Sequence, residues 1–268
     1  SGSLPATRLA VIEIDPTFLT LARASIAGAL ALLLLVAFRA PFPRRADAAS
    51  LVVVALGVVV GFPLLTGLAL QHMTSAHAIV FIGLLPLSTA IFAVLRGGER
   101  PRPLFWLFSV AGSLIVASYA WHEGSQSTLF GDMLMLAAIV VCGLGYAEGA
   151  SLSRRLGGWQ VISWALVFAL PVMLPLSVLL RPATWDGIGA MAWGGLAYVS
   201  LFSMLIGFVF WYRGLAQGGT AAVGQLQLLQ PFFGLALAAG VAGEPVSMGM
   251  VLTAAVVVLC VAGAKRFA

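Results

Sequence analysis

The chain has 268 residues, of which 61% are hydrophobic and 9% are charged, and its mean hydropathy is +1.07. This composition excludes an ordinary water-soluble domain, in which about a quarter of the residues are charged. The net charge of +5 comes from small basic clusters between apolar runs, a pattern that indicates membrane orientation and not nucleic-acid binding. Because Cys142 and Cys260 both lie in apolar stretches, we expect no disulfide framework, no metal site and no cofactor.

Apolar runs between helix breakers predict nine membrane spans. Their bounds, in chain order, are 17–38, 49–70, 76–95, 104–120, 132–152, 159–180, 190–212, 221–241 and 246–264. The opening residues 1–13 are long enough for about 20 Å of a hydrocarbon core roughly 30 Å thick, so we interpret them as the second half of one more helix. The sequence therefore predicts an all-α integral membrane protein with ten transmembrane helices, the first one truncated here.

The charges divide between the two sides of these spans. One side collects eleven of the fourteen basic residues, namely Arg39, Arg44, Arg45, Arg96, Arg100, Arg102, Arg154, Arg155, Arg213, Lys265 and Arg266. The other side holds Arg181 together with Glu13, Asp15, Glu123, Asp186 and Glu244. By the positive-inside rule the first side faces the cytoplasm, and an even number of spans places both termini there.

The two halves of the chain repeat each other. Pro86 and Pro231 lie 145 residues apart in similar settings, and the same offset relates Gly98-Glu99 to Gly243-Glu244. Five spans per half is an odd number, so the second repeat is inverted relative to the first, as in many transporters. We predict one repeat over residues 1–120, an extracytoplasmic connection over 121–131 and the second repeat over 132–268.

Several short motifs together resemble the drug/metabolite transporter superfamily, and specifically its EamA-type members with two five-helix repeats. These motifs are Ser1-Gly2-Ser3-Leu4-Pro5-Ala6-Thr7-Arg8, Asp15-Pro16, Leu21-Ala22-Arg23, Gly98-Glu99 and Gly243-Glu244-Pro245. The stretch from His72 to His77 is most similar to YddG-type bacterial amino-acid exporters. The resemblance implies a central cavity near helices three, four, eight and nine.

Polar groups inside membrane spans are costly and mark the candidate substrate cavity. His77 shares a helix face with Phe81 and Ser88, so a ligand could bind the imidazole while its apolar part packs on Phe81. The other interpretation is an interfacial histidine that reaches the outer surface.

The ninth span carries Gln225, Gln227 and Gln230, and the repeat offset favours Gln225 for the cavity, because it lies closest in angle to the position equivalent to His77. Each glutamine could equally be a structural hydrogen-bonding link between helices. Pro86 and Pro231 remove hydrogen bonds in mid-helix, so they predict paired kinks that gate the substrate region. The Gly57/Gly61 and Gly145/Gly149 pairs are spaced for close helix packing.

Glu148 is the one carboxylate predicted well inside a span. It either pairs with Arg154 and Arg155 at the cytoplasmic interface or acts as a proton-coupling group. Arg8 and Arg23, near the outer ends of their helices, are either orientation anchors or groups that attract a substrate carboxylate.

Aromatic residues of the second half have two interpretations. Trp211 and Tyr212, beside Arg213, are typical of an interfacial belt. Deeper residues that could line the cavity or pack in the core are Tyr146, Trp164 and Tyr198, with Ser203 nearby.

Taken with the resemblance, the sequence predicts a bacterial inner-membrane secondary transporter that exports aromatic and other neutral amino acids by alternating access. The alternative is a proton-coupled exporter of drugs or amphipathic metabolites that uses Glu148. We expect no enzyme, because neither a nucleophile with its base nor a metal-binding set such as His-Glu-x-x-His is present. The expected partners are a small-molecule substrate, namely amino acids, and the lipid bilayer, with no nucleic acid. The sequence does not give the oligomeric state, and a monomer is compatible with it.

Overall fold

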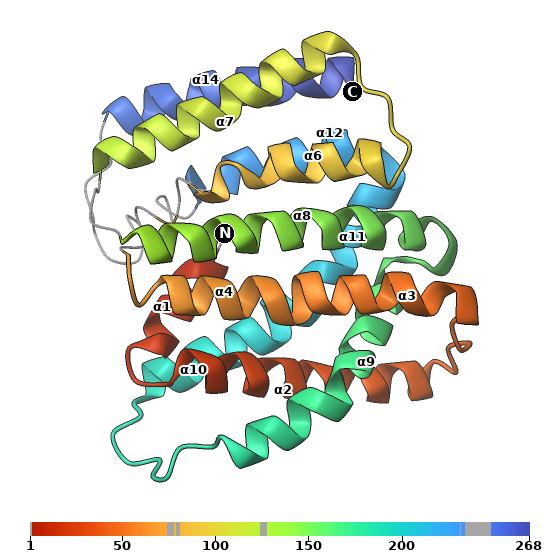
Figure 1. Cartoon of the computed structure of the whole chain (residues 1–268), viewed down its shortest axis with the longest axis vertical. Coiled ribbons are helices and arrows are strands. Elements are labelled where there is room, and N and C mark those ends of the chain that lie inside the picture. Colours follow the sequence, from red (N-terminus) through yellow and green to blue (C-terminus); the bar gives the residue numbers. More distant parts are fainter. Residues whose placement is uncertain (1, 74–77, 79–80, 124–127, 231, 234–247) are drawn as a thin grey trace.

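The computed structural model of the chain describes residues 2–73, 78, 81–123, 128–230, 232–233 and 248–268. Within these ranges the regular elements are helices, and Figure 1 shows most of them running across the molecule in a common direction, with α9 and α11 crossing obliquely. The first half contains α1 (Ser3–Val11), α2 (Pro16–Ala37), α3 (Arg45–Val54), η1 (Ala55–Gly61), α4 (Phe62–Ala69), α6 (Leu85–Leu95) and α7 (Pro103–Glu123). The second half contains α8 (Leu129–Leu156), α9 (Gly158–Leu179), α10 (Ala190–Tyr198), η2 (Val199–Ile206), α11 (Gly207–Gly218), α12 (Thr220–Gly224), η3 (Gln225–Leu229) and α14 (Met248–Phe267).

The described elements join into ten helical stretches, because α3–η1–α4, α10–η2–α11 and α12–η3 are each continuous. Five stretches are long and apolar enough to cross a membrane, namely Pro16–Ala37, Arg45–Ala69, Leu129–Leu156, Gly158–Leu179 and Ala190–Gly218. Shorter apolar helices cover Leu85–Leu95 and Pro103–Ser118. The predicted all-α membrane fold is confirmed.

Local capping explains where several helices begin and end. Asp15 caps α2 by accepting a hydrogen bond of 2.9 Å from a backbone N–H three residues later, and Pro16 occupies the first turn, where no N–H donor is needed. Thr128 caps α8 in the same manner, with a 3.2 Å bond. Gly157 separates α8 from α9 at φ +85°, a conformation that glycine adopts without a steric penalty.

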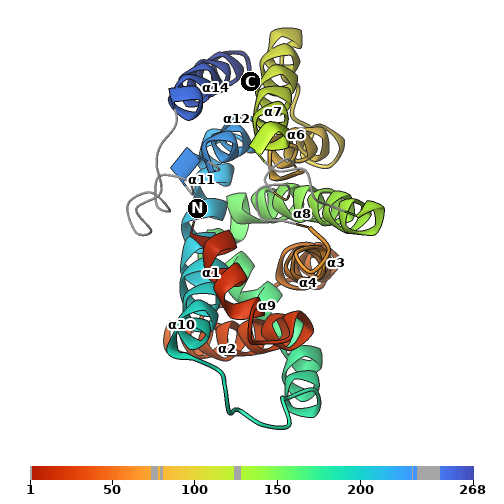
Figure 2. The ribbon, with the colours of Figure 1, turned by 90° about the vertical axis from the view of Figure 1, so that its left-hand side faces the viewer.

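Helix packing follows the two inverted repeats. The second helices of the two halves, α2 and α9, pack against each other, and so do the fifth helices, α7 and α14, as Figures 1 and 2 both show for the latter pair. The contact of α1 with α10 has its counterpart in the contact of α8 with α3. These equivalent pairings relate the halves by a pseudo-two-fold axis in the membrane plane.

Glycines allow a close contact between η1 and α8. A Cβ atom on Gly57 would lie 2.4 Å from the backbone oxygen of Val141 and 3.2 Å from the Cα of Gly145. One turn further along α8, a Cβ on Gly149 would overlap the ring of Tyr212, whose side chain is fully buried. Close helix packing was predicted at two glycine pairs, and it is confirmed for three of their members, Gly57, Gly145 and Gly149.

The structure corrects the predicted kink at Pro86. This proline lies in the first turn of α6, which begins at Leu85, so the helical path is interrupted before the proline and not bent at it. A proline in the first turn leaves no intrahelical hydrogen bond unmade. Pro231 lies outside the described residues.

Candidate functional site

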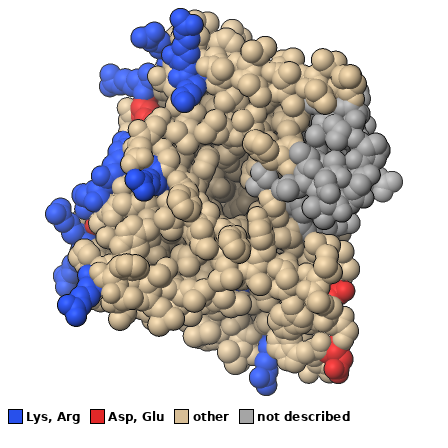
Figure 3. Space-filling model, turned by 180° about the vertical axis from the view of Figure 1, so that it is seen from behind, with Lys and Arg blue, Asp and Glu red and all other residues tan. Residues whose placement is uncertain are grey.

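A cavity of about 380 Å³ lies between the two halves and is visible as the hollow in Figure 3. Helices from both repeats form its wall. The lining residues are Ser3, Thr7, Arg23, Val58, Phe62, Pro63, Thr66, Ile82, Leu85, Tyr146, Tyr198, Phe202, Ser203, Gly207, Phe208, Trp211, Leu226, Gln227, Gln230 and Phe233. Its volume falls in the range of roughly 300–1,000 Å³ that is typical of small-molecule sites.

Two π-helical segments border this cavity. η1 covers Ala55–Gly61 and η2 covers Val199–Ile206. A shift of 145 residues places η1 on 200–206, within η2. Each is continued by α-helix, and both contribute lining residues, Val58 from η1 and Ser203 from η2. Because π-helical turns are frequent at functional sites, their paired position at one cavity supports it as the candidate site.

The same offset relates the lining residues themselves. Six lining residues of the first repeat have a partner 145 positions later that also lines the cavity: Val58/Ser203, Phe62/Gly207, Pro63/Phe208, Thr66/Trp211, Ile82/Gln227 and Leu85/Gln230. The cavity therefore lies on the pseudo-two-fold axis, where each repeat presents the same positions. In transporters built from inverted repeats, this interface holds the substrate.

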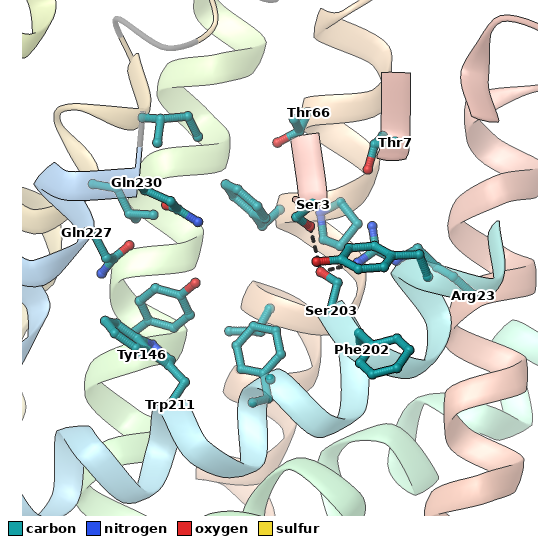
Figure 4. A pocket seen from close by; sticks show the side chains of 18 of the residues that line it. Ser3, Thr7, Arg23, Thr66, Tyr146, Phe202, Ser203, Trp211, Gln227 and Gln230 are labelled. Carbon is teal, nitrogen blue, oxygen red and sulfur yellow. Dashed lines mark hydrogen bonds between the residues drawn. The ribbon is translucent and has the colours of Figure 1, made fainter. Parts of the chain in front are cut away.

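One end of the cavity is polar and basic. Arg23 of α2 is 6% exposed, and its Nη2 donates to the Ser203 hydroxyl over 3.4 Å. The Ser203 and Ser3 hydroxyls share a hydrogen bond of 2.6 Å. Figure 4 shows these three side chains together, with Thr7 and Thr66 on the same side of the cavity. The Arg23 Nε has no hydrogen-bond partner in the described part of the chain.

The opposite end carries amides and aromatic rings. Gln227 and Gln230 lie together on η3 and the residue after it, across the cavity from Arg23 (Figure 4). The Nε2 of Gln227 and the Nε1 of Trp211 find no hydrogen-bond partner among the described residues. The ring of Tyr146 lies 5.6 Å from that of Trp211, measured between centroids, so an aromatic wall adjoins the amides.

Ion pairs join helix ends at the basic edge of the molecule, which Figure 3 shows as a row of Lys and Arg side chains. Arg96, after α6, pairs with Glu148 of α8, whose side chain is 7% exposed. The predicted pairing of Glu148 with Arg154 and Arg155 is wrong, because these two side chains reach carboxylates on other segments.

Those other carboxylates are Asp47 and Glu99. Arg155 pairs with Asp47 of α3, and Arg154 lies 3.0 Å from Glu99. Glu99 also accepts backbone hydrogen bonds of 2.8 and 2.9 Å from the first two residues of α12. Four segments are thereby linked at this edge, away from the cavity lining.

Comparison with known proteins decides the family. The sequence profile of the EamA-like transporter family matches residues 1–119 and 129–264. The chain belongs to the EamA-like transporter family.

The relatives of this EamA-like transporter are also transporters. It is 69% identical to the uncharacterized transporter YdeK of Bacillus subtilis (strain 168), over the whole of this chain and 93% of YdeK. The uncharacterized transporters YetK and YyaM of the same organism are each 23% identical, over 91% and 80% of this chain and 77% and 72% of their own lengths. One crystal structure, 19% identical, superposes with a TM-score of 0.75 over 100% of this chain and 99% of that chain, so the fold is shared.

The predicted site residues of the EamA-like transporter fall into two described groups. Tyr146, Tyr198 and Ser203 line the cavity. Four others lie outside the lining: Phe81, Ser88, Trp164 and Gln225. His77 lies outside the described residues. Substrate contacts for all of them stay predictions.

Three of the residues outside the lining are instead hydrogen-bonded or buried within the helix bundle. The Ser88 hydroxyl donates to the backbone oxygen of Ile139 on α8 over 3.1 Å. Trp164 is 5% exposed and packs in the main core, where its ring centroid lies 5.1 Å from that of Phe42. Gln225 is fully buried. The structure reverses the predicted preference for Gln225 over Gln227 in the lining.

Two further interpretations of the sequence are corrected. The predicted interfacial belt at Trp211 and Tyr212 is wrong, because α11 continues to Gly218 and keeps both residues inside the bundle. Trp211 lines the cavity, and the Tyr212 hydroxyl donates to the Gly145 backbone oxygen over 3.1 Å. Arg23 is buried against the cavity and does not reach a surface as an orientation anchor would. The Arg8 side chain lies outside the described residues.

Proposed function

We propose that this EamA-like transporter is a bacterial inner-membrane secondary carrier that exports neutral amino acids, aromatic ones included, by alternating access. The observation that carries the proposal is the cavity on the pseudo-two-fold axis, with a basic end at Arg23, an amide end at Gln227 and an aromatic wall. A zwitterion with an apolar side chain needs such a mixture of hydrogen-bonding groups and apolar surface.

The neutrality of most of the lining supports small uncharged or zwitterionic solutes. The described lining includes one arginine and no acidic residue. A cavity built for organic cations would need a carboxylate or a comparable acceptor, since an unpaired charge in a low-dielectric site is costly. The amides, hydroxyls and aromatic rings suit a broad range of amino acids, in agreement with the resemblance to YddG-type exporters.

The charge distribution supports the proposed orientation. Basic residues lie at the start of α3, after α6 and in the last turns of α8 and α14. The side of the molecule that carries them would face the cytoplasm by the positive-inside rule. Both termini would then be cytoplasmic. The ion pairs of Glu148, Glu99 and Asp47 at this edge would form the inner closure of the carrier, broken and remade as the cavity changes side.

The ion pair of Glu148 with Arg96 bears on the alternative, proton-coupled export of drugs or amphipathic metabolites. This ion pair links α8 to the segment after α6, which favours a structural role for Glu148 over that of a proton carrier. Glu148 is also absent from the described lining. We therefore retain facilitative amino-acid transport as the proposal.

Counterflow in proteoliposomes tests this function. The full-length protein is reconstituted in vesicles loaded with unlabelled phenylalanine, leucine or glutamine, and uptake of labelled phenylalanine is followed with and without a pH gradient. We expect accelerated uptake with all three loads and no requirement for the gradient. Uptake equal to that of protein-free vesicles would contradict the proposal, and gradient-dependent movement of a lipophilic cation would favour the alternative.

A further inference from the structure

The cavity contains a buried cation that the described residues do not neutralise. Arg23 is 6% exposed, and its recorded contact is a 3.4 Å hydrogen bond to the neutral Ser203 hydroxyl. The three described ion pairs join other arginines to their carboxylates, at the opposite edge of the molecule. Because a buried guanidinium is stable only when it is paired or well hydrated, an anionic ligand would supply the missing partner.

The geometry around Arg23 suits a carboxylate. A guanidinium binds a carboxylate through two parallel hydrogen bonds, and here Nε, the donor on the side of the chain stem, is free among the described residues. The hydroxyls of Ser203 and Ser3 adjoin the same group and can donate to carboxylate oxygens. A single positive charge with neutral neighbours matches a single negative charge.

The two polar ends of the cavity lie at different depths in the membrane. Arg23 is seven residues, or about 10 Å, from the start of α2, and Gln227 is seven residues, again about 10 Å, from the start of α12. These two helices start at opposite sides of the membrane, so roughly 10 Å of a 30 Å core separates the polar ends along the normal. A ligand bound at both ends would therefore be elongated and aligned with the transport direction.

The repeat correspondence shows that equivalent lining positions of the two halves differ in polarity. Three pairs of equivalent lining positions combine an aliphatic residue of the first repeat with a polar residue of the second, namely Val58/Ser203, Ile82/Gln227 and Leu85/Gln230. Identical repeats would offer two equivalent polar sets and two opposite ligand poses. Because equivalent positions carry unlike side chains here, the cavity offers one pose.

We propose that the cavity selects solutes by their carboxylate, which Arg23 binds with Ser203, while the far end of the solute meets Gln227 and Gln230. This inference deepens the proposed function and rests on the same cavity. Monocarboxylates with an apolar or amide-bearing body are ligands, whether or not they carry an amino group. Amines that lack the carboxylate are not ligands.

The first test uses the wild-type protein and three competitors of labelled phenylalanine counterflow. These are 3-phenylpropionate, which keeps the carboxylate, phenethylamine, which keeps the amine, and phenylalaninamide, in which the carboxylate is blocked. We expect 3-phenylpropionate to compete, and the other two to need at least tenfold higher concentrations, because a lost charge-assisted hydrogen bond has about that effect. Equal competition by phenethylamine would overturn the inference while leaving amino-acid transport intact.

The second test compares Arg23→Lys and Arg23→Gln, with Arg181→Gln as the matched control. Arg181 is exposed after α9 and outside the cavity lining. We expect Arg23→Gln to abolish the preference for 3-phenylpropionate over phenethylamine, Arg23→Lys to retain part of it and Arg181→Gln to leave it unchanged. An unchanged preference in Arg23→Gln would refute the assignment; if that variant does not fold, the lysine variant and the wild-type competition still decide.

Direct binding separates the two proposals. Thermal stabilisation of the purified wild-type protein by each compound measures binding without transport. Stabilisation by 3-phenylpropionate and not by phenethylamine, with no phenylalanine counterflow, would sink the proposed function and keep carboxylate recognition. Stabilisation by both compounds alike would sink carboxylate recognition.

Discussion

The glycine at position 57 gives the sharpest test of how the two repeats pack. In Gly57→Ala the new Cβ would lie 2.4 Å from the Val141 oxygen, 3.2 Å from the Gly145 Cα and 3.4 Å from the Gly145 nitrogen. All three neighbours are backbone atoms, so no change of rotamer relieves the overlap and η1 must move away from α8. Overpacking of this kind costs about 1–3 kcal/mol, which exceeds the gain of up to about 1 kcal/mol in helix propensity.

The net cost is about 1–2 kcal/mol, and for a chain of this size each kcal/mol changes the melting temperature by roughly 2–4 °C, so we expect Gly57→Ala to melt about 2–8 °C below wild type. The measurement is thermal unfolding of the detergent-purified protein, followed by tryptophan fluorescence. Gly194→Ala is the matched control, because it is also a helical glycine but a Cβ there would meet nothing within 4 Å. If Gly57→Ala melts no lower than Gly194→Ala, the close packing of η1 on α8 is refuted.

Three further variants test other contacts. Tyr212→Phe removes the hydrogen bond to the Gly145 oxygen, so we expect a loss of about 1 kcal/mol, seen as a lower melting temperature with unchanged expression; an equal or higher value would show that the bond contributes nothing. Glu148→Gln and Arg96→Gln break one ion pair, so both should lower the melting temperature alike and leave the dependence of transport on a pH gradient unchanged; a selective change of that dependence in Glu148→Gln would support proton coupling. Glu99→Gln removes the negative charge at the start of α12, so the melting temperature of this variant should be modestly lower than that of wild type, and the difference should be smaller in high salt than in low salt. The absence of a salt effect would argue against an electrostatic cause.

The membrane fold could be predicted because hydropathy, charge and repeat spacing each carry separate information about where the helices lie and how they are oriented. Apolar runs mark where helices cross, basic clusters mark the side on which they end, and the offset between Pro86 and Pro231 also aligns the lining pairs of the cavity. The glycine spacing at Gly57 and Gly145 likewise predicted a close approach, because only hydrogen side chains fit between two backbones.

The site could be predicted only in part, because the local winding of a helix does not follow from its hydropathy. An angle of 100° per residue applies to an α-helix, but η3 is a 3-10 helix with three residues per turn, which changes the faces of Gln225 and Gln227. A basic residue such as Arg213 after aromatic residues is typical of a helix end, whereas α11 continues beyond it to Gly218. Arg23 lies only two turns from the start of its helix, so sequence position alone could not separate an anchor from a cavity residue.

The paired π-helical segments also determine which side chains turn toward the cavity. A π-helix is wound more loosely than an α-helix, so it shifts the face of the residues that follow. A shift of 145 residues places η1 within η2, so this change of face occurs at equivalent positions of the two halves. The lining pairs that follow the two segments are Phe62/Gly207, Pro63/Phe208 and Thr66/Trp211, and each reaches the cavity from the same face of its helix.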